Sequence, residues 1–252
     1  MARPVLTLQL FTVRDVLGDD FDATLEKVKE MGYEGVELTG TGPHQPAELK
    51  ELLGDLGLEP AGIHMPLTEL EDNLEECIEV ARGVETTNIV CPFLPEERRQ
   101  SRDDWLELAS ILDDVGARCR EEGLRLSYHN HSFEFVEFDG TYALDLLLGA
   151  CSEENVASEL DTYWVKHGGA DPVSYIDKYA GRIEILHAKD MAPGEEQAFT
   201  EIGNGILDWE AILEAAERAD VDYVCVEQDT CPGDPLESAA ASAEYLRSEF
   251  GL

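Results

Sequence analysis

Two histidines lie one residue apart in the middle of the chain, within the stretch SYHNHSFEF from Ser127 to Phe135. They are His129 and His131, and the whole chain has six histidines. Because alternate residues of an extended strand point to the same side, these two imidazoles share one face. The pair could bind a metal ion, act as an acid and a base, or form the polar edge of an ordinary strand.

Other residues able to bind metals or carry protons also end short apolar runs. They are Glu37, His64, Asp161, His187 and Glu227. Taken singly, each is as easily explained as a hydrogen-bonded rim residue or as a cap of the next helix. An aspartate, a histidine and a glutamate at the ends of three successive runs are harder to explain by capping. Carboxylate and imidazole together suit Mn, Zn, Co or Fe, and Mg less well.

The apolar runs that carry these residues are predicted to be strands. There are eight, at residues 6–13, 33–38, 58–65, 87–93, 124–131, 156–161, 183–190 and 221–228. Between them lie segments with helical periodicity, such as 22–32, 46–57, 103–123, 208–220 and 235–250. Gly32, Gly57 and Gly123 stand where a helix should end and a strand begin, as is typical of glycines at helix C-termini.

An alternation of strand and helix repeated eight times predicts an α/β fold, a (β/α)8 TIM barrel that forms a single domain over residues 1–252. The alternative is an open, doubly wound sheet, but no G-x-G-x-x-G follows the first strand. In a TIM barrel the carboxyl ends of the strands meet at one mouth, where active sites lie. The barrel would therefore bring the polar residues at the strand ends together.

The charge of the chain is unusual. It contains 55 acidic and 18 basic residues, and its formal net charge is -37. The acidic residues are spread over the whole chain, and molar salt shortens the range of their repulsion. We therefore expect a halophilic protein. Nucleic acid is not expected as a partner, because phosphate binding needs a basic surface.

The spacing of the cysteines and the hydropathy of the chain argue against several further classes of protein. The six cysteines are scattered with no C-x-x-C pair, which predicts buried free thiols and neither a zinc ribbon nor a disulfide scaffold. No apolar run approaches the roughly 20 residues that span a bilayer, and the N-terminal segment is too short in apolar residues for a signal peptide. We expect a cytoplasmic protein without a membrane partner.

Three long segments carry a family resemblance. YHNHSFEF, ELDTYWVKHGGADPVSYIDKYAGRIEILHAKDM and VEQDTCPGDPLES resemble the sugar phosphate isomerase/epimerase family, xylose isomerase-like TIM barrels related to inosose dehydratase and to the endonuclease IV fold. LQLFTVRD and GYEGVEL match as well, so the likeness runs from near residue 7 to the C-terminus. It implies an enzyme of carbohydrate metabolism with a divalent metal ion (Mn, Zn, Co or Mg) at the barrel mouth.

The resemblance also implies the ligands of that ion, which in the family are Glu, Asp, His and Glu. Asp161, His187 and Glu227 occupy three of these positions. The remaining glutamate position falls near Ser127, whose side chain is too short to serve. His129, or failing that His131, is then expected to supply the fourth ligand.

The expected activity is that of an isomerase or epimerase which removes a proton next to the carbonyl of a keto-sugar or polyol-derived substrate and passes through an enediolate. Glu227 is the expected base, His131 an acid, and Lys189 an oxyanion-binding or proton-transfer residue. The mouth is expected to be lined by Gln9, Glu37 and His64, with Trp164 stacking on a sugar face. A histidine at strand five argues against the symmetric two-glutamate epimerisation of the family.

Several alternatives stay open. Within the same class, the chain could be an inosose dehydratase-like lyase. In other classes, it could be an endonuclease IV-like metal-dependent hydrolase, for which it has too few histidines and no DNA-facing surface, or a sugar-binding barrel without catalysis. The expected partner is a small sugar or polyol. A homodimer is compatible with the fold.

Overall fold

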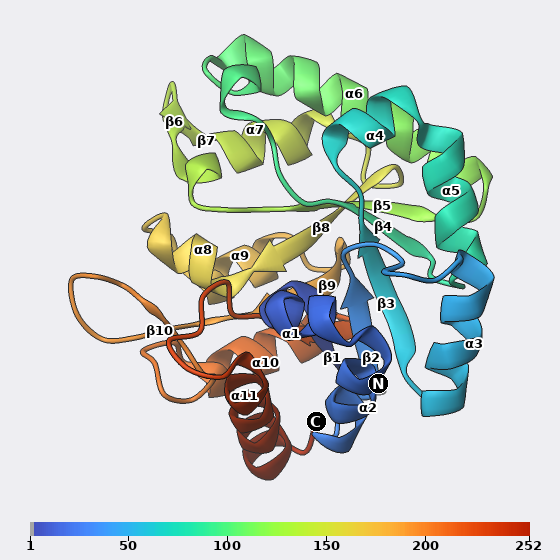
Figure 1. The fold of residues 1–252 in the computed structure, drawn as a ribbon. Helices are drawn as coiled ribbons and strands as arrows, with labels where there is room; N and C mark the ends of the chain where they lie inside the picture. Colours follow the sequence, from blue (N-terminus) through green and yellow to red (C-terminus); the bar gives the residue numbers. More distant parts are fainter. Residues whose placement is uncertain (1–2) are drawn as a thin grey trace.

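Eight parallel strands close into a barrel in a computed structural model that describes residues 3–252 (Figure 1). The predicted TIM barrel is thereby confirmed. In order around the barrel, the strands are β1 (Val5–Gln9), β2 (Gly35–Leu38), β3 (Glu59–His64), β4 (Asn88–Cys91), β5 (Arg125–His129), β8 (Val156–Asp161), β9 (Ile183–Ala188) and β12 (Tyr223–Val226), which pairs with β1 again.

Helices surround the barrel and connect successive strands (Figure 1). They are α1 (Arg14–Asp19), α2 (Phe21–Glu30), α3 (Pro46–Leu56), α4 (Leu67–Asp72), α5 (Leu74–Gly83), α6 (Arg102–Glu121), α7 (Ala143–Ala150), α8 (Thr162–His167), α9 (Pro172–Lys178), α10 (Trp209–Arg218) and α11 (Pro235–Phe250). As predicted, Gly57 ends α3 in the left-handed conformation, with φ at 65°. No helix in the described part of the chain is long and apolar enough to cross a membrane.

Short elements decorate the loops at the mouth. Three are 3-10 helices: η1 (Leu10–Val13), η2 (Glu96–Arg98) and η3 (Phe133–Phe135). Two are small antiparallel hairpins, β6 (Glu137–Phe138) with β7 (Thr141–Tyr142), and β10 (Asp190–Met191) with β11 (Phe199–Thr200). These elements were not predicted, because each is too short to produce a hydrophobic period.

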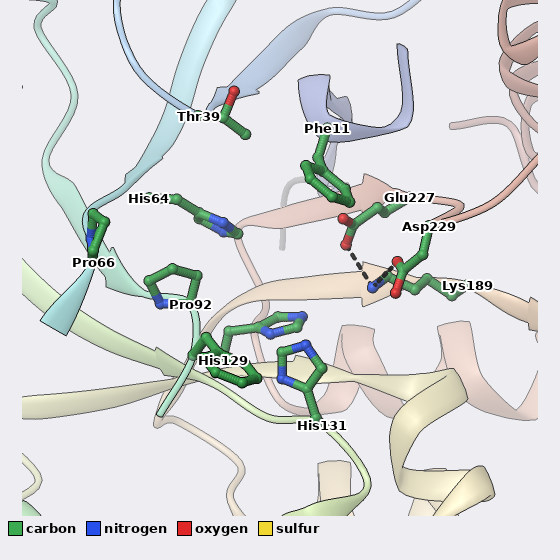
Figure 2. A pocket seen from close by; sticks show the side chains of 11 residues that line it. Phe11, Thr39, His64, Pro66, Pro92, His129, His131, Lys189, Glu227 and Asp229 are labelled. Atoms are coloured by element: carbon green, nitrogen blue, oxygen red, sulfur yellow. Dashed lines mark hydrogen bonds and ion pairs between the residues drawn. The ribbon is translucent and has the colours of Figure 1, made fainter. Parts of the chain in front are cut away.

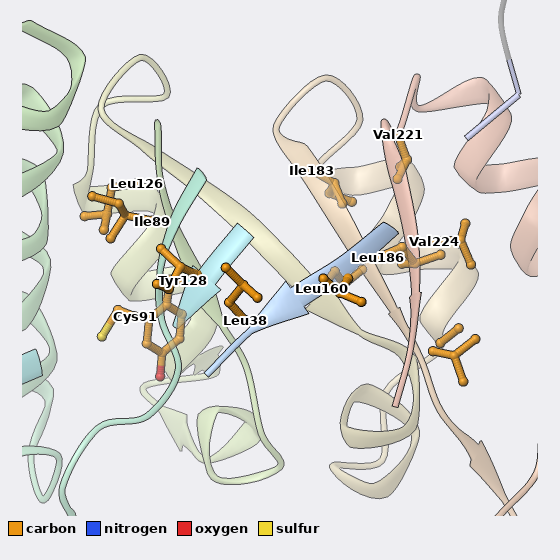
Figure 3. Packing of buried hydrophobic residues seen from close by; sticks show 14 of the residues in the cluster. Leu38, Ile89, Cys91, Leu126, Tyr128, Leu160, Ile183, Leu186, Val221 and Val224 are labelled. Atoms are coloured by element: carbon orange, nitrogen blue, oxygen red, sulfur yellow. The ribbon is translucent and has the colours of Figure 1, made fainter. Parts of the chain in front are cut away.

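The alternation of side chains along each strand separates the core from the barrel interior. Leu126, Leu160, Leu186 and Val224 point outward from neighbouring strands and are fully buried in the main core (Figure 3). The residues next to them in sequence point inward. Val90, Ile185 and Cys225 form a separate small apolar cluster. Closer to the carboxyl ends of these strands, the inward-pointing residues are mostly polar, and they build the site.

Six of the eight strands end earlier than the sequence pattern predicted, and three of these bear most on the site. The predicted strand 6–13 ends at Gln9, 124–131 ends at His129, and 221–228 ends at Val226. The chain turns at these points because polar side chains hold the next residues: the Gln9 Oε1 accepts a hydrogen bond from the Phe11 peptide N–H. Glu227 therefore lies just beyond its strand.

The cysteines agree with the predicted free thiols. All six are free, and five of them are buried, the exception being the partly exposed Cys231.

Candidate metal centre and active site

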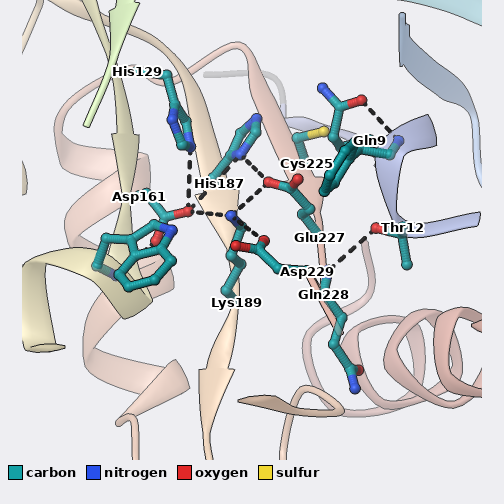
Figure 4. Close-up of polar contacts among 12 residues, drawn as sticks. Gln9, Thr12, His129, Asp161, His187, Lys189, Cys225, Glu227, Gln228 and Asp229 are labelled. Atoms are coloured by element: carbon teal, nitrogen blue, oxygen red, sulfur yellow. Dashed lines mark hydrogen bonds and ion pairs between the residues drawn. The ribbon is translucent and has the colours of Figure 1, made fainter. Parts of the chain in front are cut away.

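Four side chains expected to bind a metal converge at the mouth of the barrel (Figure 4). They are His129, Asp161, His187 and Glu227, called here the outer group, and each is at most 6% exposed. One donor atom of each lies within 4.8 Å of the others. The His187 Nδ1 is 2.8 Å from the Glu227 Oε2, and the His129 Nε2 is 3.4 Å from the Asp161 Oδ2.

Three buried atoms of the outer group form no hydrogen bond: the His129 Nδ1, the His129 Nε2 and the Asp161 Oδ2. The His129 Nε2 faces the Asp161 Oδ2, which also lies 3.0 Å from the Lys189 Nζ. Buried polar atoms are nearly always satisfied, so an imidazole with neither nitrogen hydrogen-bonded calls for an explanation. Ligands around a tetrahedral zinc ion, at bonds of about 2.0–2.1 Å, stand roughly 3.3 Å apart. The spacing and chemistry of the outer group therefore fit a divalent ion.

The Asp161 carboxylate has two functions. Its Oδ1 accepts a hydrogen bond from the Trp164 peptide N–H at 2.7 Å and so caps α8, while its Oδ2 belongs to the outer group. Capping and participation in the site are thus compatible. Asp171 and Asp208 cap α9 and α10 in the same way.

A second set of donors lies beneath the first and shares His187 with it. This inner group consists of Glu37, His64, Glu159 and His187. The His187 Nε2 is 2.6 Å from the Glu37 Oε2 and 3.0 Å from the Glu159 Oε1. One imidazole cannot give both of its nitrogens to a single ion. His187 therefore presents Nδ1 to the outer group and Nε2 to the inner group.

A cavity of about 320 Å³ distinguishes the two groups (Figure 2). His129 and Glu227 of the outer group line it, whereas Glu37 and Glu159 do not. His131, Lys189 and Asp229 line it as well, and from the inner group only His64 reaches it. A small molecule in the cavity would meet the outer group directly, and the inner group supports it from below.

Three residues expected at the mouth lie elsewhere. Gln9 and Glu37 are fully buried below the cavity, where the Gln9 Nε2 donates a hydrogen bond to the Glu37 Oε2 at 2.7 Å. Trp164 does not line the cavity either. Its ring packs beside His131 with the ring centroids 5.4 Å apart.

Lys189 supplies positive charge to the outer group. Its Nζ lies 3.0 Å from the Asp161 Oδ2, 2.7 Å from the Glu227 Oε2 and 2.7 Å from the Asp229 Oδ1. Burial acts to lower the pKa of Lys189, but the three carboxylates outweigh it and hold that pKa well above its usual value. Burial acts to raise the pKa of Glu227, and Lys189 and His187 hold it well below its usual range. The ammonium and the carboxylate therefore both stay charged.

His131 stands beside the outer group and is not part of it. Its ring centroid lies 4.9 Å from that of His129. Burial, together with the neighbouring His129, lowers the pKa of His131 to about 2, so its imidazole is neutral. The expected acid is therefore a neutral hydrogen-bonding group.

The loop that carries His131 is held by Glu134. The Glu134 Oε2 accepts a hydrogen bond from the His131 peptide N–H at 2.8 Å, and its Oε1 accepts one from the Tyr128 hydroxyl. Burial raises the pKa of Glu134 to about 8. This fully buried residue does not line the cavity, and its contacts are those of a residue that fixes the loop.

Several residues of the site were not predicted. Asp229 and Glu159 each lie two residues from a predicted ligand, so the alternation of side chains could have indicated them. Phe11 and Phe93 line the cavity as well, but in the sequence they read as the continuation of apolar strands. Nothing in the pattern marked these two as wall residues.

Comparison with known families shows which family the chain belongs to. The model of the family described as xylose isomerase-like TIM barrel matches residues 25–249. The chain belongs to this family. Among its curated relatives is an inosose dehydratase of Lacticaseibacillus casei, 26% identical over 271 residues that cover 92% of this chain and 90% of that protein. An inosose dehydratase of Geobacillus kaustophilus (strain HTA426) is 27% identical over 91% of this chain and 88% of its own length.

Solved structures of this family share the fold. A sugar phosphate isomerase/epimerase from Parabacteroides distasonis ATCC 8503 superposes with a TM-score of 0.85 at 23% identity and covers 100% of this chain and 96% of its own. An IolI protein with a bound zinc atom superposes with a TM-score of 0.77 at 14% identity, covering 97% of both chains. These family barrels include enzymes named for isomerisation, epimerisation and dehydration of sugars and cyclitols.

Proposed function

We propose that this protein is a metal-dependent enzyme that removes a proton next to the carbonyl of a keto-sugar or inosose. The observation that carries the proposal is the outer group, which offers two imidazoles and two carboxylates to a cavity of about 320 Å³ beside a buried lysine. A divalent ion held by His129, Asp161, His187 and Glu227 would supply Lewis acidity that stabilises negative charge on the substrate oxygens. Manganese, zinc, cobalt or magnesium would serve.

Glu227 is the proposed base. Its Oε2 faces His187 and Lys189 and is the atom that would bind the ion, so Oε1 is left to take the substrate proton. Lys189 holds the carboxylates in their ionised form and places a positive charge beside the reacting oxygen. The neutral His131 exchanges hydrogen bonds with a substrate hydroxyl, and His64 lines the opposite side of the cavity.

The fate of the proton separates the two candidate reactions. In dehydration the electrons of the broken C–H bond form a C=C bond, the hydroxyl on the next carbon leaves, and the proton on Glu227 completes the departing water. In isomerisation the same proton returns to a neighbouring carbon. Because strand β5 offers His129 in place of a second carboxylate, a one-base reaction suits the site better than two-base epimerisation. We favour dehydration, supported by the inosose dehydratases that match over nine-tenths of this chain, with isomerisation as the second candidate.

Metal content measured by elemental analysis tests the site. We expect about one ion per chain in the wild type and in His131→Ala, and loss of that ion in His129→Ala and in Asp161→Asn. The asparagine keeps an oxygen to cap α8, so the loss would reflect the site alone. Asp171→Asn, which changes a cap of the same kind on α9, is the matched control and should retain the metal. A wild type that takes up no supplied metal would refute the proposal.

The reaction itself is tested with scyllo-inosose in D₂O. Dehydration would produce the ultraviolet absorbance of a conjugated enone, whereas isomerisation would place deuterium next to the carbonyl without loss of water. Glu227→Gln should abolish either outcome in protein that has been supplied with metal. Turnover by that variant at the wild-type rate would exclude Glu227 as the base.

A further inference from the structure

Two exposed aromatic side chains stand in the wall of the cavity. In the described part of the chain four large hydrophobic side chains are exposed: Phe11 at 40%, Phe93 at 47%, Val136 at 45% and Ile206 at 50%. Phe11 and Phe93 both line the cavity, and Figure 2 shows the Phe11 ring beside Glu227. Exposed apolar side chains gathered at a cavity mark a binding surface.

Neighbouring side chains hold both phenylalanines in place. The Arg14 Cζ lies 4.0 Å from the centroid of the Phe11 ring, and its guanidinium donates to the main-chain oxygens of Phe11 and Asp229. Phe93 packs edge-to-face against His131 and Phe133, with centroid separations of 5.6 and 5.5 Å. Phe11 and Phe93 are thus a preformed surface, called here the aromatic wall, and the ordering cost of binding against it is small.

Polarity is unevenly divided across the cavity. Phe11 follows β1 and Phe93 follows β4, and on the arc between them lie Pro66, Pro92 and two polar side chains, Thr39 and His64. The remaining arc, from β5 to β12, presents only polar side chains: His129, His131, Lys189, Glu227 and Asp229. A ligand with an apolar surface for the two phenylalanines and polar groups for the β5–β12 arc therefore suits this lining.

Ring closure is what gives a polyhydroxylated molecule such a shape. In an open-chain ketose each carbon rotates, so hydroxyls and hydrogens alternate and no face stays apolar. In a six-membered ring with equatorial hydroxyls the axial C–H bonds project from the ring faces, while the carbonyl and hydroxyls extend from the edge. Aromatic side chains pack well against such a face.

We propose that Phe11 and Phe93 determine specificity, by selecting a single six-membered ring ketone over open-chain keto-sugars. The inference rests on the proposed function, since it presumes that the carbonyl edge of the ring faces the outer group. It replaces the stacking expected of Trp164, whose ring packs against His131 outside the cavity lining.

Binding measured by calorimetry on zinc-loaded protein tests the inference. The two probes are scyllo-inosose, a ring ketone, and L-erythrulose, a ketose too short to close a six-membered ring. Phe11→Leu and Phe93→Leu should each weaken scyllo-inosose binding by about five- to tenfold, the scale of one aromatic contact. Erythrulose binding should change less than about twofold in either variant. Phe250→Leu, at the far end of α11, is the matched control and should bind both probes as the wild type does.

The outcomes separate this inference from the proposed function. Unchanged scyllo-inosose affinity in both wall variants, or an equal loss for erythrulose, would overturn the role of the wall. Failure of the wild type to bind scyllo-inosose would overturn it as well. Metal uptake is measured on the same preparations. Neither phenylalanine is a proposed ligand, so the wall variants should bind metal as the wild type does. A wild type that takes up no metal would refute the proposed function by itself.

Discussion

At the scale of single residues, the orientation of His187 decides what the site can do. A metal-binding histidine usually donates its other ring N–H to a carboxylate, which fixes the tautomer and turns the free nitrogen toward the ion. The Glu37 Oε2, 2.6 Å from the His187 Nε2, is placed to do this. The Gln9 amide holds the same oxygen at 2.7 Å, and the Gln9 carbonyl is in turn fixed by the Phe11 peptide N–H. With the proposed ion bound to the outer group, Glu37 would therefore position His187.

Replacing Glu37 by glutamine tests this arrangement. The change keeps the size of the side chain and removes the charge that orients His187, so metal affinity should fall by about 10- to 100-fold. Competition with a chelator gives the affinity, and the visible spectrum of cobalt-loaded protein reports the ligand geometry. Glu59→Gln is a matched control. Glu59 begins β3, at the end of the barrel away from the site, so this change should leave the metal affinity and the cobalt spectrum unchanged. Wild-type affinity in folded Glu37→Gln would contradict the role.

The sequence could predict those residues of the site whose position shows in the hydrophobic pattern. Asp161, His187 and Glu227 are polar residues at the ends of apolar runs, and the structure brings them together with His129, as predicted. How far along the barrel axis a side chain lies leaves no such signal in the sequence. Gln9 and Glu37 were therefore expected at the mouth and lie below it, because the level of a side chain depends on the stagger between strands.

At the scale of elements, the alternation of strand and helix was enough to predict the barrel, since it needs only the hydrophobic period of each segment. The loops at the mouth were not predictable in this way. The segment after β9 runs from the β10–β11 hairpin to α10 and is organised by one side chain, Asp190, which is 1% exposed. Its carboxylate accepts hydrogen bonds from the peptide N–H groups of Met191, Gly203, Gly205 and Leu207 and from the Trp209 Nε1.

This loop should therefore depend on Asp190. In Asp190→Asn an N–H₂ group replaces one of two oxygens that together accept five hydrogen bonds, and buried donors lose their partners. The free energy of unfolding should fall by roughly 3 kcal/mol, and the amides of Gly203 and Gly205 should exchange faster with solvent. Urea denaturation and hydrogen exchange measure the two effects. Asp208→Asn, a change of the same kind at the cap of α10, should be nearly neutral because asparagine caps helices well. Equal stability of the two variants would contradict this assignment.

At the scale of the whole molecule, the negative charge is the dominant feature. Many of the 18 basic residues are already used in surface ion pairs, such as Arg3 with Glu34 and Arg218 with Asp177. Exposed pairs of this kind contribute little to stability. Most of the 55 acidic residues therefore remain uncompensated, and their mutual repulsion disfavours the compact state.

Stability should consequently rise with salt. Raising KCl from about 0.1 M to about 1 M shortens the Debye length from roughly 10 Å to 3 Å, which screens the repulsion between carboxylates more than it weakens the few ion pairs. We expect the midpoint of thermal unfolding to increase by at least about 5 °C, equivalent to a gain of roughly 2 kcal/mol in a chain of this size. Differential scanning calorimetry over a KCl series measures the shift.

Comparing salts separates screening from a general effect of excluded solutes. Sulfate stabilises folded proteins by being excluded from their surfaces, whatever their charge. Screening requires that chloride salts also stabilise, and that the gain shrinks as pH falls toward the isoelectric point of about 4.2, where the net charge vanishes. A midpoint that rises in sulfate but stays level in KCl would show that the acidic surface has not been selected for high salt. The charge would then have to be explained by solubility alone.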